Sequence, residues 1–240
     1  MRARADFVRS LLVSTPAGTH VAPMFDRVHI DEKWFVVNKT KRRVYLTPTE
    51  PNPQRHAQHK SHLPKLMFLC AITRPRVDPA TGASFDRGIG IWPFAEEIPA
   101  YRSSSNRQAG TLETKPLPAN KETYKAMIMT EVVPAVVSKW PAWGGRHIVL
   151  QRDNANPHRV VTSADLTATM VTTGLSIMVE CQPPQSPDLN MLDLGFFSAL
   201  QSEQFKRKRA ALTSWCRGFV RHSTISPARR WITRSSLYNT

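Results

Sequence analysis

Three aspartates in this chain occupy sequence contexts that could each place a carboxylate at one end of a sheet. Asp31 lies in the segment VHIDEKWF, Asp153 in QRDNANPH and Asp193 in SPDLNMLDLG. Carboxylates are hard oxygen ligands that suit Mg²⁺ or Mn²⁺, and acids that converge from separate elements can hold two metal ions for phosphodiester chemistry. The three are therefore our candidate catalytic and metal-ligating residues. An isolated aspartate is more often a helix cap or an ion-pair partner, so the hypothesis needs all three together.

The charge of the chain indicates a nucleic-acid partner. Lysine and arginine number 33 against 18 acidic residues, which gives a net charge of +15, and residues 206–240 hold nine of the basic residues and no acidic one. Such a chain is drawn to polyphosphate by counterion release. A solvated charged face is the alternative for the two basic runs, and the second could also be a nuclear localisation signal. The candidate DNA-backbone contacts are Lys39, Lys41, Arg42, Arg43, Lys206, Arg207, Lys208 and Arg209.

Length and composition bound the class of protein. The 240 residues, 41% of them hydrophobic, allow one domain with flanking segments. Three cysteines are too few and too scattered for a disulfide framework or a zinc site. No apolar stretch is long enough to cross a membrane, and the first 18 residues lack the apolar core of a signal peptide. We expect neither membrane insertion nor secretion.

Hydrophobic patterns predict the elements that would position the three acids. Strands are predicted at residues 27–37, 42–46, 66–73, 89–94, 147–151 and 175–179, and helices at 120–139, at 163–173 and from 190 onward. Residues 101–120 read as a loop. Asp31 would lie inside the first strand and Asp153 just after the strand at 147–151. Asn190 would cap the last helix, with Asp193 completing a capping box. Strands followed by alternating helices and strands predict an α/β fold.

Residues 28 to about 209 resemble the catalytic domain of mariner-like DDE/D transposases, and most closely the plant- and oomycete-type branch. The segments VHIDEKWF, KLMFLCAITRPR, GIGIWPF, NRQAGTLE, QRDNANPH and SPDLNMLDLGFF occur in the order of that family. Asp153 and Asp193 are separated by 39 residues, the spacing of the branch that uses Asp as its third acid. The resemblance implies a ribonuclease H-like fold, with a mixed five-stranded sheet flanked by helices. It also implies a two-metal Mg²⁺ or Mn²⁺ site on Asp31, Asp153 and Asp193.

Residues beside the acids carry weaker expectations. Asn154 is predicted to orient Asp153 through its side-chain amide. A structural role is predicted for His158, and an approach to the site or to the DNA is the alternative. Glu32 follows Asp31 on the opposite face of a strand, so we predict a structural role for it. Asp188 is predicted to satisfy backbone N–H groups before the last helix.

The resemblance also divides the chain. We predict a short N-terminal remnant at 1–25, the catalytic domain at 26–209 and a basic, disordered tail at 210–240. Complete transposases of this kind carry helix-turn-helix motifs ahead of the first catalytic strand, whereas only 30 residues precede Asp31. We therefore expect a truncated protein that lacks the region reading the element's ends.

The expected function is that of a transposase catalytic core, which cleaves and transfers DNA strands in cut-and-paste transposition. DNA is the expected partner, the nucleus the expected location, and a homodimer is compatible with the family. The alternative is a non-catalytic, basic nucleic-acid-binding remnant of a decayed element, and a host-adopted nuclease is a third reading. Whether the chain is an enzyme therefore stays open, and metal-dependent nicking separates the alternatives.

Overall fold

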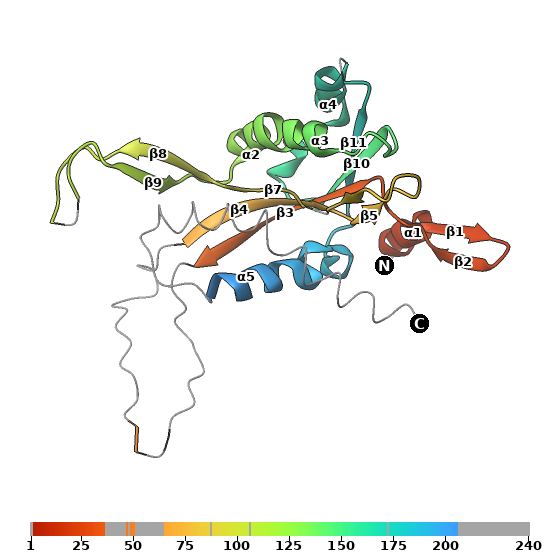
Figure 1. Ribbon diagram of the computed structural model, residues 1–240, viewed down its shortest axis with the longest axis horizontal. Coiled ribbons are helices and arrows are strands. Elements are labelled where there is room, and N and C mark those ends of the chain that lie inside the picture. Colours follow the sequence, from red (N-terminus) through yellow and green to blue (C-terminus); the bar gives the residue numbers. More distant parts are fainter. Residues whose placement is uncertain are drawn as a thin grey trace.

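A mixed five-stranded sheet forms the centre of the protein (Figure 1). The computed structural model describes residues 2–36, 47, 49–50, 65–86, 88–105, 107–171 and 173–205. The strand order is β11-β10-β3-β4-β7. β10 pairs in parallel with both β11 and β3, whereas β3 with β4 and β4 with β7 are antiparallel. The strands are β3 (Arg27–Val36), β4 (Lys65–Thr73), β7 (Gly88–Pro93), β10 (His147–Arg152) and β11 (Ser176–Cys181). The predicted α/β fold with a mixed five-stranded sheet is confirmed.

Helices cover both faces of this sheet (Figure 1). One face carries α2 (Lys121–Met127), α3 (Val133–Lys139) and α4 (Ser163–Met170), and the other carries α5 (Phe197–Phe205). Successive side chains of a strand point to opposite faces, so neighbouring residues enter different cores. Leu69 packs in the core beneath α2, α3 and α4, whereas Phe68 packs with Phe35 and Phe197 beneath α5. Burial on both faces explains why β4 reads as a continuous apolar run.

The helix predicted at 120–139 is present as one run of three helical segments. Asn120 accepts a hydrogen bond from the Thr123 N–H, and the Thr123 hydroxyl contacts the Asn120 N–H, which completes a capping box. A π-helical turn, Ile128–Val132, joins α2 to α3. Pro134 directly follows the first residue of α3, inside this run, where its ring nitrogen cannot donate the hydrogen bond that an N–H would make. The expected interruption is therefore a change of helical geometry within a continuous run.

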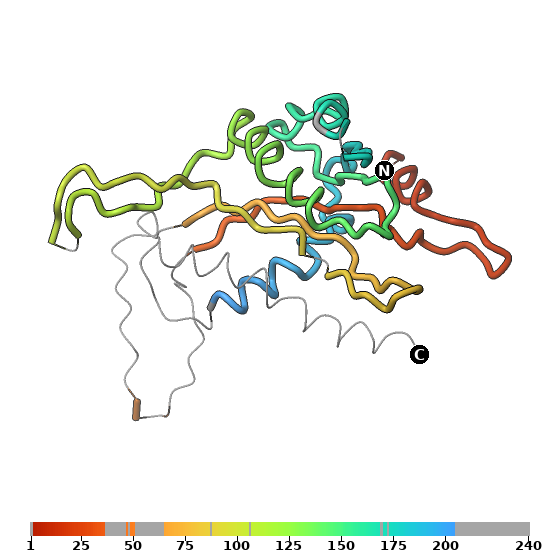
Figure 2. Tube along the Cα trace, turned by 45° about the horizontal axis from the view of Figure 1, so that its top comes forward, coloured from red at the N-terminus to blue at the C-terminus, as the bar shows by residue number. Residues whose placement is uncertain are grey.

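Among the described residues, three hairpins lie outside the central sheet, and the sequence patterns predicted none of them. β1 (Leu12–Thr15) and β2 (Gly18–Val21) follow α1 (Arg2–Ser10), while β5 (Arg76–Val77) pairs with β6 (Ser84–Phe85). β8 (Ala95–Pro99) and β9 (Leu112–Pro116) form an arm that projects from one end of the molecule, opposite the β1–β2 hairpin (Figures 1 and 2). The prediction of a loop at 101–120 was wrong for β9. Exposed pairs such as Glu96 opposite Lys115 give no hydrophobic alternation to detect.

Several predictions lie outside the described residues. They are the strand at 42–46, the basic residues Lys39, Lys41, Arg42, Arg43, Lys206, Arg207, Lys208 and Arg209, and the tail at 210–240. Among the residues that the structure describes, no helix is long and apolar enough to span a membrane.

A buried arginine ties β5 to the end of the helical layer. The Arg76 guanidinium carbon lies 4.6 Å from the ring centre of Trp140 and 5.0 Å from that of Phe85, and the rings of Phe25 and Trp143 lie within 6 Å. Its Nη1 also donates to the Phe25 carbonyl. A planar guanidinium can stack on aromatic faces, and such contacts strengthen when water is excluded.

Replacing Arg76 with lysine should therefore lower the free energy of unfolding by about 1–2 kcal/mol, since the ammonium keeps the charge but loses the planar contacts. Denaturant unfolding measures this difference. The control is Arg74→Lys, because Arg74 is exposed and lies over the Phe25 ring, and it should change stability by less than about 0.5 kcal/mol. Equal effects of the two substitutions would show that the ring contacts of Arg76 add no particular stability.

Candidate metal-dependent active site

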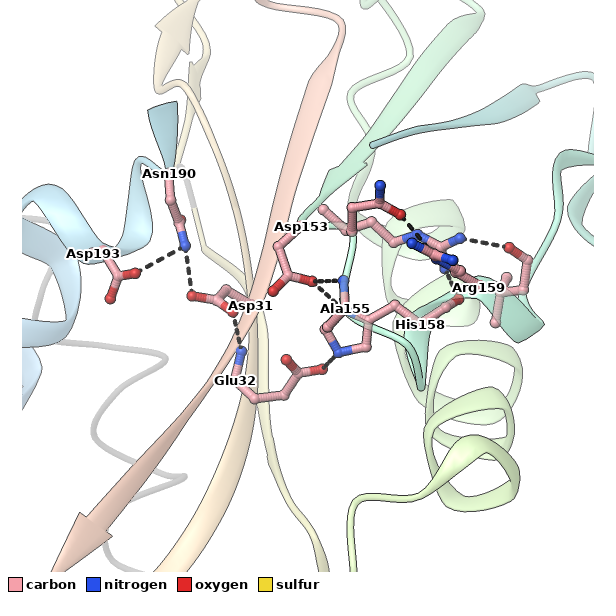
Figure 3. Close-up of polar contacts among 11 residues, drawn as sticks. Asp31, Glu32, Asp153, Ala155, His158, Arg159, Asn190 and Asp193 are labelled. Atoms are coloured by element: carbon pink, nitrogen blue, oxygen red, sulfur yellow. Dashed lines mark hydrogen bonds and ion pairs between the residues drawn. The ribbon is translucent and has the colours of Figure 1, made fainter. Parts of the chain in front are cut away.

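The three predicted aspartates line one cleft of about 400 Å³. Asp31 lies within β3, Asp153 directly follows β10, and Asp193 lies in the π-helical turn Leu192–Phe196 that precedes α5. Figure 3 shows their side chains gathered beside β3. The cleft is also lined by Asn154, Arg159, Gln182, Ser186 and Asn190. Residues far apart in the sequence thus bring three carboxylates to one place.

Strand register explains why Asp31 and Asp153 meet. β10 and β3 run in parallel, with Leu150 opposite Val28 and Gln151 opposite His29. Two residues further along each strand, Asp153 reaches the level of Asp31. A shift of one residue would turn one of the two side chains to the other face of the sheet.

Asn190 connects the first acid to the third. Its Nδ2 donates to Asp31 Oδ2 at 2.6 Å and lies 3.1 Å from Asp193 Oδ2, while its Oδ1 accepts from the Leu192 N–H at 3.0 Å. The predicted capping box of Asn190 with Asp193 was wrong, because Asp193 contacts the side-chain amide of Asn190 and the first turn is π-helical. One amide group therefore holds two carboxylates and the start of the helix.

Asp153 is held by its own loop. Its Oδ1 accepts from the Ala155 N–H at 3.0 Å and contacts His158 Nδ1. The side-chain oxygen of Asn154 accepts from Arg159 Nε at 3.1 Å, and among the described residues no hydrogen bond is seen between the Asn154 amide and Asp153. The contact with Asp153 places His158 beside the site.

The electrostatic environment differs between the acids. Burial raises the pKa of Asp31 to about 7. The charges of nearby Glu32 and Asp193 act in the same direction, whereas hydrogen bonds from the Asn190 side chain and the Glu32 N–H act against it. Burial would also raise the pKa of Asp153, but its contacts with His158 and Ala155 lower it below the usual value. Burial opposes the charge of His158, yet Asp153 and Glu32 raise its pKa to about 9. Lys33 Nζ lies 3.8 Å from Asp193 Oδ1.

This donor set fits a hard divalent cation in its chemistry. Carboxylate oxygens are the ligands that Mg²⁺ and Mn²⁺ prefer, and the buried Asp31 lies in surroundings where a cation would favour its charged form. Among the described residues, however, no three His, Cys, Asp or Glu side chains form a complete metal-binding group. The three aspartates thus line one cleft without forming such a group. N–H groups of Asn190 and His158 instead take up carboxylate oxygens that a metal would share.

One other acid and an aromatic pair belong to the surroundings of the cleft. Asp188 forms an ion pair with Arg4 at 2.6 Å, and so links α1 to the loop before Asp193. Phe35 is fully buried. Trp34 is 43% exposed and lies beneath the Lys65 ammonium. Alternation along β3 puts the two rings on opposite faces.

Comparison with known proteins gives likeness in fold alone. No protein-family model matches the chain, and no curated protein matches it. The Mos1 mariner paired-end complex with Mn has a TM-score of 0.55 and 17% identity over 86% of this chain and 50% of that chain. For the mariner Mos1 paired-end complex with Mg, the TM-score is 0.52 and the identity 16%, over 87% of this chain and 50% of that chain. For a pre-cleavage Mos1 transpososome, the TM-score is 0.50 and the identity 16%, over 88% of this chain and 55% of that chain. The chain thus spans about half the length of these structures, and the ribonuclease H-like fold is confirmed.

The raised pKa of Asp31 predicts a pH-dependent cost of folding when no divalent cation is present. Since its folded pKa of about 7 exceeds its unfolded value of about 3.9, the folded state binds more protons, and stability falls as pH rises from about 4 to 7. In EDTA, Asp31→Asn should therefore raise the free energy of unfolding at pH 8 by about 1–3 kcal/mol and change it little at pH 4.

Thermal unfolding at the two pH values measures the effect. Asp188→Asn is the control, because Asp188 is exposed, pairs with Arg4 and is not one of the residues that line the cleft. An Asp31→Asn protein with the same pH dependence as wild type would show that Asp31 carries its charge at no cost.

Proposed function

We propose that this chain is the catalytic domain of a mariner-like DDE/D transposase that cleaves and transfers DNA strands with divalent metal ions. The observation that carries the proposal is the convergence of Asp31, Asp153 and Asp193 on one cleft from three separate elements. Likeness in fold to Mos1 transposon complexes supports it. The sequence motifs and the 39-residue spacing support the plant- and oomycete-type branch.

Some residues that line the cleft would bind metal ions, and another would bind the phosphate. Two Mg²⁺ or Mn²⁺ ions on the three aspartates would activate a water or 3′-hydroxyl and stabilise the leaving oxygen. Asn190 orients Asp31 and Asp193, while His158 and Ala155 N–H orient Asp153. Arg159 lines the same cleft and would offer a guanidinium to a scissile phosphate. No covalent intermediate on the protein is needed.

The second candidate is a basic nucleic-acid-binding remnant that does not cut DNA. The incomplete metal-binding group among the described residues favours it. Both candidates bind DNA through the same excess of positive charge, and we propose the nucleus as their location. A homodimer is part of the first proposal only.

Metal-dependent nicking distinguishes the two candidates. The purified chain should nick supercoiled DNA with Mn²⁺ or Mg²⁺, and Asp153→Asn should lower the rate by more than about 100-fold, since it removes a ligand charge with little change of shape. Gel analysis of plasmid relaxation measures the rate, and circular dichroism checks the fold. Asp188→Asn should nick as wild type does. Equal nicking by Asp153→Asn would identify a contaminating nuclease, and no nicking by any protein favours the remnant.

Binding should be sensitive to salt and indifferent to sequence. Phosphate contacts carry no sequence information, so affinity for random DNA and for an inverted-repeat sequence should fall alike as salt rises. Deleting residues 210–240 removes five positive charges, which should weaken binding uniformly and reduce the slope of log affinity against log salt by at most about 4.5. Fluorescence anisotropy at several salt concentrations measures both. A preference for the repeat that persists at high salt would reveal a sequence-reading surface.

A further inference from the structure

Glu32 is a buried acid on the side of β3 that faces away from the cleft. Its side chain is 9% exposed, and alternation along the strand points it opposite to Asp31 (Figure 3). Burying a carboxylate is costly unless a charged or hydrogen-bonding partner compensates it. The partner is His158, whose Nε2 lies 3.0 Å from Glu32 Oε1.

His158 is itself fixed from several directions. Its side chain is 9% exposed, and its ring stacks on the buried Tyr124 ring with centres 4.3 Å apart. Its backbone carbonyl accepts from Arg152 Nη1, and Arg152 Nη2 also donates to the Val161 carbonyl at 2.8 Å. An imidazole held in this way has one orientation, in which its two nitrogens face two different carboxylates.

The second nitrogen of that ring contacts the candidate metal ligand. Nδ1 of His158 meets Asp153 Oδ1, which also accepts the Ala155 N–H. Figure 3 shows the other carboxylate oxygen of Asp153 on the side of Asp31. One oxygen of Asp153 is thus engaged by its supports and the other is turned toward the cleft.

We propose that Glu32 is a positioning residue of the metal site, which acts through His158 to fix the carboxylate of Asp153. Consecutive residues of β3 then serve both halves of the site, Asp31 directly and Glu32 by way of the imidazole. This inference rests on the proposed function, because it assumes that Asp153 binds metal. Residues that orient a ligand from behind commonly change metal affinity by about 10–100-fold when replaced.

Mn²⁺ binding provides a measurement that does not depend on nicking. Electron paramagnetic resonance of free Mn²⁺ gives the dissociation constant of the wild-type chain, and Asp153→Asn should weaken it. Glu32→Gln keeps the size of the side chain and removes its charge, and should weaken Mn²⁺ binding by about 10–100-fold. In a His158→Asn background the same substitution should have almost no further effect, because the connection to Asp153 is already lost.

A control variant separates positioning from stability. Val136→Ala removes buried methyl groups from α3, away from the cleft, and should lower the melting temperature without changing Mn²⁺ affinity. If Glu32→Gln fails to fold by circular dichroism, Glu32→Asp keeps the charge on a side chain one methylene shorter. It should weaken binding in the same direction.

The outcomes distinguish this inference from the proposed function. If Asp153→Asn loses Mn²⁺ affinity but the folded Glu32 variant binds as wild type does, Glu32 only balances charge in the fold and the inference is wrong. An additive loss in the His158→Asn background would also overturn it, since Glu32 would then act by another route. If wild type and Asp153→Asn bind Mn²⁺ equally poorly, the proposed metal site itself fails and the inference fails with it.

Discussion

The parallel hydrogen bonding of β10 to β3 is the constraint on which the rest of the site depends. This pairing fixes the position along β3 at which β10 ends, so the turn after Arg152 lies beside the middle of β3. The loop from Gln182 to Asn190 leaves the neighbouring strand β11 at the same edge, and Gln182 Nε2 donates to the Leu189 carbonyl at 2.9 Å to close it. Ends of adjacent parallel strands necessarily share an edge, so the cleft is a product of topology before any side chain is chosen.

The side chains then balance like charges against one another. Three carboxylates in one cleft repel one another. An amide from Asn190, an imidazole from His158 and an ammonium from Lys33 contact these carboxylates and offset the repulsion. Each of these groups comes from an element different from that of the acid it contacts, or from a separate turn.

Much of the sheet could be predicted from the sequence because its strands are buried. The apolar run of β4 and the alternation around Asp31 report burial directly, and the helix at 120–139 shows both its cap and its period. The exposed strands β8 and β9 carry no such hydrophobic pattern, because backbone hydrogen bonds between strands form with polar and apolar side chains alike. Contacts across long sequence distances were also hidden. Nothing local to Glu32 indicates that an imidazole more than a hundred residues away will reach it.

Hydrophobic patterns predicted Asp31 within a strand and Asp153 just after one, and family motifs grouped them with Asp193, whereas the contacts of their neighbours could not be predicted. A capping box was the reasonable prediction for Asn190, since a residue able to accept a helix N–H usually does so. The structure shows that the Asn190 oxygen accepts from the Leu192 N–H, while the amide nitrogen of the same side chain donates to the carboxylate of Asp31. Patterns along the chain describe what a side chain can do locally, and tertiary structure decides which of those options is used.

The β8–β9 arm has a further consequence for how the molecule could be altered. The two ends of the arm are already joined, because the Leu117 N–H donates to the Phe94 carbonyl at 2.9 Å before the chain enters α2. Because its two ends are joined in this way, the arm can be changed in length or at its tip while the strands and helices on either side keep their places. The arm is therefore a natural site for grafting a peptide tag or a fluorescent reporter, remote in sequence from all three acids.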